Sequence, residues 1–248
     1  MAQVTDFSTL TFDCYGTLID WERGILNELE PWTASRGCMI DGETILQVFG
    51  ETEARCEAEA PQALYPAILA EVFRQLATRW SIELGSGEAE RFGGSVGRWP
   101  AFPDSAAALQ YLKQHYRLVI ISNIDRASFA ASNDKLGVKF DRIITAQDVG
   151  SYKPDLKNFE YALADISRHL GATKAQILHT AQSIFHDIVP AKSIGLSTMW
   201  VNRRKTLGGG WGATPAPRTT GEAIQPDFEV GSLAELVTLH RQQLGKMD

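Results

Sequence analysis

The alternation of β-prone and helical segments in the second half of the chain constrains the fold more than any other feature. Its pattern predicts strands at 117–122, 142–145, 176–180 and 197–201, and helices at 126–136, 155–170 and 188–194. Such alternation is typical of a mostly parallel sheet with right-handed crossovers. Thr9–Phe12 has the composition of a strand buried on both faces, so we assign it to the same sheet. The sequence therefore predicts an α/β fold.

Residues 20–99 differ from the rest, because they show helical patterns and no strand pattern. Helices are predicted over 20–31, 43–60, 66–80 and 88–96, the first being disturbed at Pro31. A stiff Pro-containing stretch at 99–103 follows them. We therefore predict a core domain of residues 1–19 and 100–248, with a helical domain of residues 20–99 inserted after the first strand.

The end of the chain carries a stretch without periodicity. Residues 205–226 are rich in Gly, Pro and Thr, and a loop of that length in a compact domain is usually functional or mobile. A final edge strand is predicted at 227–230, followed by a helix that Ser232 caps.

Composition excludes several classes of protein. With 44% hydrophobic and 22% charged residues, the chain is an ordinary globular protein. A net charge of -6 and a pI near 5.4 give no reason to expect nucleic acid or an anionic membrane as partner. The three cysteines form no CxxC pair, which favours reduced thiols. The first residues lack the features of a secretory signal, so the cytoplasm is the expected location.

The first predicted strand ends in an aspartate beside a glycine turn. Asp13 would stand at the carboxyl end of that strand, the edge where open α/β sheets bind ligands. Gly16 allows a sharp turn that brings main-chain N–H groups towards a bound anion, and Thr17 can hold the turn or Asp13. This pattern predicts a nucleophile, although an aspartate that only caps a turn fits the local sequence equally well.

Three more polar groups follow predicted strands or precede helices. Ser122 and Asn123 end the second strand, Lys153 precedes a helix, and His186 and Asp187 follow the fourth strand. Taken singly, these are typical turn, cap or surface residues. Because the carboxyl ends of parallel strands meet at one edge of a sheet, together they strengthen the prediction that Asp13 is a nucleophile.

In order and spacing, the segments DCYGTL, IISN, SYKPD and the run ending at Asp187 resemble the four motifs of the haloacid dehalogenase-like superfamily. The resemblance covers nearly the whole chain. It implies a Rossmann-like, three-layer αβα core with a mostly parallel sheet and an inserted helical cap that closes over the site.

Two positions indicate a branch of this superfamily. Its phosphatases carry a second aspartate where this chain has Tyr15, and an acidic residue where it has Gln182. A hard cation with so few oxygen charges binds weakly. The sequence is similar to the 2-haloacid dehalogenase (type II) family, which implies a small carboxylate as substrate, with neither metal nor organic cofactor.

The resemblance implies a role for each catalytic residue. Asp13 would attack the carbon that bears the leaving group and form an aspartyl ester, which water then cleaves. Lys153 would keep Asp13 ionised and Thr17 would orient it. Asp187 would orient or activate the water, with help from Ser183.

The same resemblance implies the binding groups. Ser122 and the main-chain N–H groups of Cys14 and Tyr15 would receive the substrate carboxylate, and Asn123 would lie on the halide side. Arg55 is the nearest candidate for the cap arginine that attracts the departing halide, ahead of Arg23.

Some positions depart from the family pattern and leave the function open. The chain has Gln182, Ile184 and Phe159 where relatives have serine, asparagine and tyrosine, and His186 replaces an aromatic pocket wall. His186 could act as a base on water or be only a polar wall. The alternatives are a phosphate monoesterase and a non-catalytic binding protein. A homodimer is expected by resemblance only.

Overall fold

The computed structural model describes residues 2–205 and 225–245. Within them, six parallel strands form one sheet in the order β3, β2, β1, β4, β5, β6. The strands are β1 (Thr9–Phe12), β2 (Arg117–Ser122), β3 (Arg142–Thr145), β4 (Ile177–Ala181), β5 (Ser197–Val201) and β6 (Phe228–Val230). β1 lies in the middle of the sheet between β2 and β4. The predicted α/β fold with a parallel sheet is confirmed.

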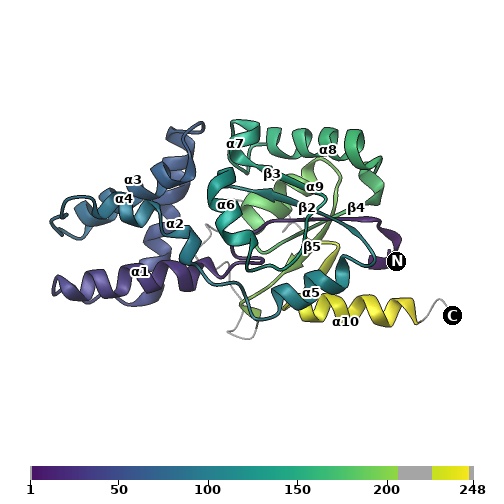
Figure 1. Cartoon of the computed structure of the whole chain (residues 1–248), viewed down its shortest axis with the longest axis horizontal. Coiled ribbons are helices and arrows are strands. Elements are labelled where there is room, and N and C mark those ends of the chain that lie inside the picture. The colour runs from purple at the N-terminus through teal and green to yellow at the C-terminus, as the bar shows by residue number, and fades with distance from the viewer. Residues whose placement is uncertain (1, 206–224, 246–248) are drawn as a thin grey trace.

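Helices cover both faces of the sheet. Figure 1 shows α5 (Ser105–Leu112) and α10 (Leu233–Leu244) on one side, and α8 (Lys157–Leu170) with α9 (Val189–Ser193) on the other. Side chains alternate along each strand, so Leu10 and Phe12 of β1 join a core that includes residues of α5 and α10. Val119 and Ile121 of β2 face the second core, with residues of α8 and α9. The core is therefore a three-layer αβα structure.

Four helices lie between β1 and α5 in the sequence, and Figure 1 shows them to one side of the sheet. They are α1 (Trp21–Ser35), α2 (Gly42–Glu59), α3 (Tyr65–Arg79) and α4 (Glu88–Gly93). We call them the helical insertion. Phe92 of α4 packs on Phe49 of α2 and Phe73 of α3, with ring centroids 6.2 and 4.9 Å apart. The Tyr152 hydroxyl donates to the Ala63 carbonyl at 2.8 Å and links the insertion to the αβα core.

Some helix boundaries differ from the predicted ones. α1 continues through Pro31, because Pro31 and Asn27, whose carbonyl loses its helical hydrogen bond, both lie on the exposed side of the helix. α6 (Arg126–Asn133) is shorter than predicted, and α7 (Ala146–Val149) follows β3 without having been predicted. Shorter helical turns are η1 (Val4–Asp6), η2 (Val96–Arg98), η3 (Lys174–Gln176) and η4 (Ile184–Ile188).

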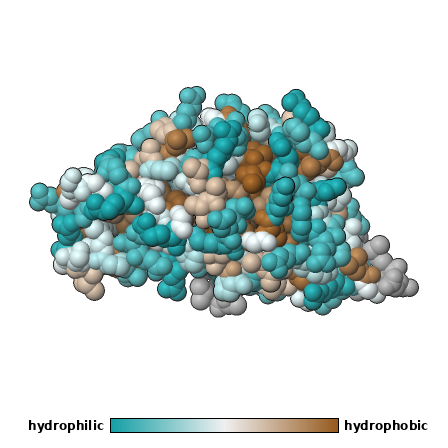
Figure 2. All heavy atoms as spheres, viewed as in Figure 1, coloured by the Kyte–Doolittle hydropathy of each residue, from teal (hydrophilic) through white to brown (hydrophobic). Residues whose placement is uncertain are grey.

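The end of the chain is described only in part. Most of the predicted loop at 205–226 lies outside the described residues. β6 pairs with β5, which confirms the final predicted strand, and the Ser232 hydroxyl caps α10 by accepting from the Glu235 main-chain N–H at 3.1 Å. None of the described helices is long and apolar enough to cross a membrane. Hydrophilic residues cover most of the face shown in Figure 2.

Candidate active site

The carboxyl ends of β1, β2 and β4 lead to a cavity of about 60 Å³. A water molecule needs roughly 10–15 Å³ by this kind of measure, so the cavity has room for a small ligand only. Residues of the αβα core and of the helical insertion both line it. They are Asp13, Tyr15, Trp21, Glu53, Glu57, Tyr65, Ser122, Asn123, Lys153, Ser183, His186 and Asp187.

Asp13 is held in one orientation by the segments around it. Its main-chain N–H donates to the Thr180 carbonyl of β4 at 3.1 Å. The Thr17 hydroxyl donates to Asp13 Oδ2 at 2.7 Å and accepts from the Gln182 N–H at 2.9 Å. Gly16 makes the intervening turn with φ +94°, a conformation that L side chains rarely adopt. The predicted turn therefore places Thr17 against the Asp13 carboxylate.

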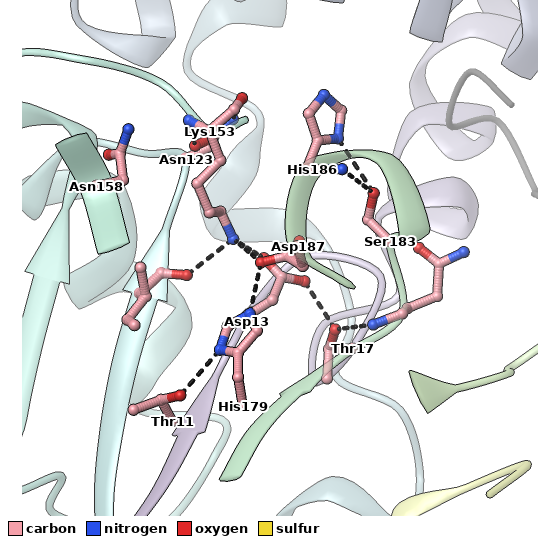
Figure 3. A network of polar contacts seen from close by, with 12 residues as sticks. Thr11, Asp13, Thr17, Asn123, Lys153, Asn158, His179, Ser183, His186 and Asp187 are labelled. Carbon is pink, nitrogen blue, oxygen red and sulfur yellow. Dashed lines mark hydrogen bonds and ion pairs between the residues drawn. The ribbon is translucent and has the colours of Figure 1, made fainter. Parts of the chain in front are cut away.

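Lys153 bridges the two carboxylates of the site, as Figure 3 shows. Its ammonium Nζ lies 3.0 Å from Asp13 Oδ1 and 2.6 Å from Asp187 Oδ1, and it also donates to the Ile121 carbonyl at 2.9 Å. Only 1% of this side chain is exposed. Although burial alone would lower the pKa of Lys153, the two carboxylates raise it above its ordinary value. The group is therefore a permanent cation between two acids.

The two carboxyl groups respond differently to burial. Burial raises the pKa of Asp13, and the Lys153 charge and the Thr17 hydrogen bond oppose this rise. At Asp187 burial also acts to raise the pKa, but Lys153 and His179 outweigh it and lower the pKa below its ordinary value. Asp187 is thus the firmly ionised member of the pair.

Sequence reasoning missed His179. Its Nε2 lies 3.0 Å from Asp187 Oδ1 and its Nδ1 lies 2.8 Å from the Thr11 hydroxyl. Because an ionised carboxylate only accepts hydrogen bonds, Nε2 carries a proton. Thr11 and His179 are register partners on neighbouring strands, both fully buried. A histidine inside a buried strand, at the position that matches a threonine of the neighbouring strand, is the signal that could have revealed this pair.

Ser183 caps the start of η4, which follows β4 and contains His186. The Ser183 hydroxyl accepts from the His186 main-chain N–H at 3.0 Å and lies 3.3 Å from His186 Nδ1. Burial lowers the pKa of His186 to about 4, so its imidazole is neutral near pH 7. Both residues line the cavity, as their predicted roles require.

The predicted carboxylate-binding groups lie beside Asp13. The Ser122 hydroxyl is buried, has no hydrogen-bond partner among the described residues and lines the cavity. In the described part of the chain, the main-chain N–H groups of Cys14 and Tyr15 have no protein acceptor either. The Cys14 side chain is buried, and the Tyr15 hydroxyl lies 2.8 Å from Ser132 Oγ. These free donors could bind an anionic group.

Asn123 is engaged with the protein on both sides. Its Oδ1 accepts from the Lys153 N–H at 2.7 Å, and its Nδ2 donates to the Lys153 carbonyl at 2.9 Å. Nδ2 also contacts Glu57 Oε2 at 3.2 Å. Asn123 therefore fixes the main chain that carries the bridging lysine, in addition to lining the cavity.

The structure corrects the assignment of Arg55. This side chain is exposed, donates to Gln75 on α3 at 2.6 Å and does not line the cavity. Glu53 and Glu57 of α2 line it instead. Each lies two residues from Arg55, about 200° around a helix, so the face of α2 that turns to the cavity is the one opposite Arg55. Arg23 is exposed and does not line the cavity either.

The donor set does not fit Mg²⁺. This ion requires near-octahedral oxygen coordination, but the Lys153 ammonium already lies between the carboxylates of Asp13 and Asp187. Tyr15 and Gln182 contribute no carboxylate at the two neighbouring positions. In residues 2–205 and 225–245, no group of three or more His, Cys, Asp or Glu side chains could hold a metal ion.

Comparisons with known proteins agree on the family. A family model described as haloacid dehalogenase-like hydrolase matches residues 7–195. The chain is 29% identical over 148 residues to (S)-2-haloacid dehalogenase of Pseudomonas sp. (strain YL), a match that covers 59% of this chain and 56% of that protein. It is 24% identical over 169 residues to pyrimidine 5'-nucleotidase YjjG of Escherichia coli (strain K12), a match that covers 67% of this chain and 68% of that protein. The chain thus spans little more than half the length of the first of these relatives.

A solved structure resembles nearly the whole chain. The L-2-haloacid dehalogenase from Xanthobacter autotrophicus superposes with a TM-score of 0.75, covering 95% of this chain and 98% of that one. Sequence identity between the two is 23%, so this likeness shows a common fold.

Proposed function

Because the chain belongs to the haloacid dehalogenase-like hydrolases, we propose that it displaces halide, or a similar leaving group, from a small 2-substituted carboxylic acid. The observation that carries this proposal is the Lys153 ammonium, which lies within hydrogen-bond distance of both Asp13 and Asp187. Tyr15 and Gln182 stand where the phosphatases of the superfamily carry acidic residues, so the site offers a metal ion few carboxylate ligands. The proposed chemistry therefore uses neither metal nor organic cofactor.

In the first step a carboxylate oxygen of Asp13 attacks the substrate carbon. A carbon–oxygen bond forms, the carbon–halogen bond breaks, and halide leaves with the bonding electrons. Thr17 and Lys153 hold the attacking carboxylate by contacts at 2.7 and 3.0 Å. Orienting the nucleophile before the reaction lowers the entropic part of the barrier.

In the second step water cleaves the aspartyl ester at its carbonyl carbon. Asp187 accepts or orients the water proton, and His179 keeps that carboxylate in place through the 3.0 Å contact to Nε2. His186 lines the cavity as a neutral imidazole and Ser183 lies beside it. Overall, the halide compound and water give an alcohol, halide and a proton, and Asp13 is regenerated.

The substrate carboxylate would bind at the free donors beside Asp13. Ser122 offers an unpartnered buried hydroxyl, and the main-chain N–H groups of Cys14 and Tyr15 have no protein acceptor in the described residues. A cavity of about 60 Å³ favours an acid of a few carbon atoms.

A phosphate monoesterase is the second candidate. The likeness to pyrimidine 5'-nucleotidase YjjG favours it, and an aspartate nucleophile serves phosphoryl transfer equally well. Tyr15 and Gln182, which replace acidic residues of the phosphatases, speak against it.

Halide and phosphate release separate the two candidates. The protein is incubated with each enantiomer of 2-chloropropionate, with fluoroacetate and with p-nitrophenyl phosphate, each with Mg²⁺ and with EDTA. We expect halide release that EDTA does not reduce and that Asp13→Asn abolishes. Mg²⁺-dependent phosphate release without any halide release would overturn the proposal in favour of the phosphatase.

A further inference from the structure

The part of the cavity wall that α2 contributes is acidic. Glu53 and Glu57 lie one helical turn apart and both line the cavity. Glu57 is only 6% exposed and contacts Asn123 Nδ2 at 3.2 Å, whereas Glu53 accepts from the Tyr65 hydroxyl. Both contacts are made by neutral donors.

Among the described residues, no cationic side chain forms an ion pair with either glutamate. Lys153 is the one cationic side chain among the described lining residues, and it pairs with Asp13 and Asp187 instead. Buried carboxylates without a cation are costly. Burial accordingly raises the pKa of Glu53 to about 7, and burial together with the Glu53 charge raises the pKa of Glu57 well above its usual range. A bound cation would relieve this cost.

A second observation shows that the same cavity is built for a polar ligand. The Ser122 hydroxyl is 3% exposed, lines the cavity and has no partner among the described residues. Buried polar atoms in folded proteins almost always have a hydrogen-bond partner, so an unpartnered one at a cavity wall points to a ligand group. This hydroxyl belongs to the αβα core, whereas the glutamates belong to the insertion. The cavity thus offers a donor at one wall and two carboxylates at another.

We infer that the substrate of Asp13 is a zwitterion, whose carboxylate binds at Ser122 and whose ammonium group lies between Glu53 and Glu57. This inference rests on the proposed function and narrows its substrate class to small 2-halo acids that also carry an amine. A plain 2-haloalkanoate brings no cation, so the two glutamates would stay largely protonated when it binds. The ammonium group supplies a positive charge to the two glutamates. Arg55 does not supply it, because this side chain is exposed on the other side of α2.

Equilibrium binding of stable product analogues tests the recognition. Isoserine and lactate differ only by an ammonium group at carbon 3, and calorimetry measures the Kd of each. We expect isoserine to bind at least about tenfold more tightly than lactate, the lower end for a hydrogen bond between charged groups. Glu57→Gln and Glu53→Gln should each reduce this ratio and leave lactate binding unweakened. Glu51→Gln removes an exposed carboxylate from the same helix and should leave the ratio unchanged.

Turnover of the matching chlorides tests the link to the reaction. Halide release from 3-amino-2-chloropropionate and from 2-chloropropionate is measured for the same variants and for Asp13→Asn, with the spontaneous rate subtracted. We expect the amino compound to have a kcat/KM higher by about tenfold or more, and this preference to fall in Glu57→Gln. Thermal melts confirm that each variant is folded.

The outcomes separate the two proposals. Asp13-dependent halide release with equal kcat/KM for the two chlorides, or with a preference that Glu57→Gln and Glu53→Gln leave unchanged, would overturn the zwitterion inference and leave the proposed function standing. Halide release from neither chloride would overturn the proposed function, and the substrate assignment with it, however tightly isoserine binds.

Discussion

Replacing Lys153 with methionine removes the charge that holds the site together. The side chain is 1% exposed, and its ammonium contacts carboxylates of which 8% (Asp13) and 1% (Asp187) are exposed. Breaking a buried ion pair by removing one partner costs about 3–5 kcal/mol. At about 2–4 °C per kcal/mol for a chain of this size, the Tm should fall by roughly 6–20 °C. The variant should also release no halide.

The pH dependence of this loss distinguishes an uncompensated charge from a packing defect. In Lys153→Met the folded-state pKa values of Asp13 and Asp187 rise above the unfolded value of about 3.9, because the Lys153 charge no longer opposes the effect of burial. A carboxyl group whose pKa is higher in the folded than in the unfolded protein contributes its full stability below the unfolded pKa. This contribution is lost as pH rises through the folded pKa. The Tm difference between variant and wild type should therefore be smaller at pH 5 than at pH 8.

Thermal melts of the wild type, Lys153→Met and Lys157→Met from pH 5 to pH 8 test this reasoning. Lys157 has a side chain that is 72% exposed, so its replacement should change stability by no more than about 0.5 kcal/mol. A Tm loss in Lys153→Met that is equal at pH 5 and pH 8 would refute the electrostatic account.

Four further predictions concern the turn at Gly16, the fall of kcat/KM at low pH and the two histidines His186 and His179. Gly16→Ala should lower the free energy of unfolding in chemical denaturation by about 1–3 kcal/mol, and by more than Gly150→Ala does. Both glycines have positive φ, but of the two only Gly16 has side-chain atoms 2.9 Å from an added Cβ. Equal losses in the two variants would contradict this. Burial raises the pKa of Asp13, so kcat/KM should be lost as pH falls through a value above about 3.9. Burial lowers the pKa of His186 to about 4, so the pH profiles of kcat/KM for the wild type and for His186→Gln should have the same inflections between pH 5.5 and 8. An inflection near pH 6.5 that only the wild type shows would contradict this pKa. His179→Leu removes a hydrogen bond to a buried carboxylate and should lower the free energy of unfolding by about 1.5–3 kcal/mol at pH 7. An unchanged denaturation midpoint would mean that His179 does not make this contact.

The sheet and the residues at its edge were predictable because they depend on local patterns. Asp13 and Ser122 each stand at the carboxyl end of a buried strand, so the strand pattern alone places both at the same edge of the sheet. The Lys153 position needed the resemblance, because nothing local distinguishes an ion-paired lysine from a solvated one. The structure places its ammonium at both carboxylates.

The helical insertion was less predictable, because the direction in which a helix face points depends on tertiary packing. The sequence offered Arg55 as the cap arginine, but it could not tell whether this side chain faced the cavity or solvent. The packing of α2 turns Glu53 and Glu57 to the cavity and leaves Arg55 exposed. His179 was missed for a different reason, since its partner Thr11 is far away in sequence and becomes its neighbour only through strand pairing.

A single turnover in ¹⁸O-labelled water tests the central claim, that Asp13 forms an ester with the substrate carbon. Excess enzyme is mixed with a chloride substrate, and the oxygen isotopes of the alcohol product and of the peptide containing Asp13 are measured by mass spectrometry. Since water attacks the ester carbonyl, we predict unlabelled product and one ¹⁸O atom in the Asp13 carboxylate. Labelled product with unlabelled Asp13 would mean direct attack by water, and would contradict the account.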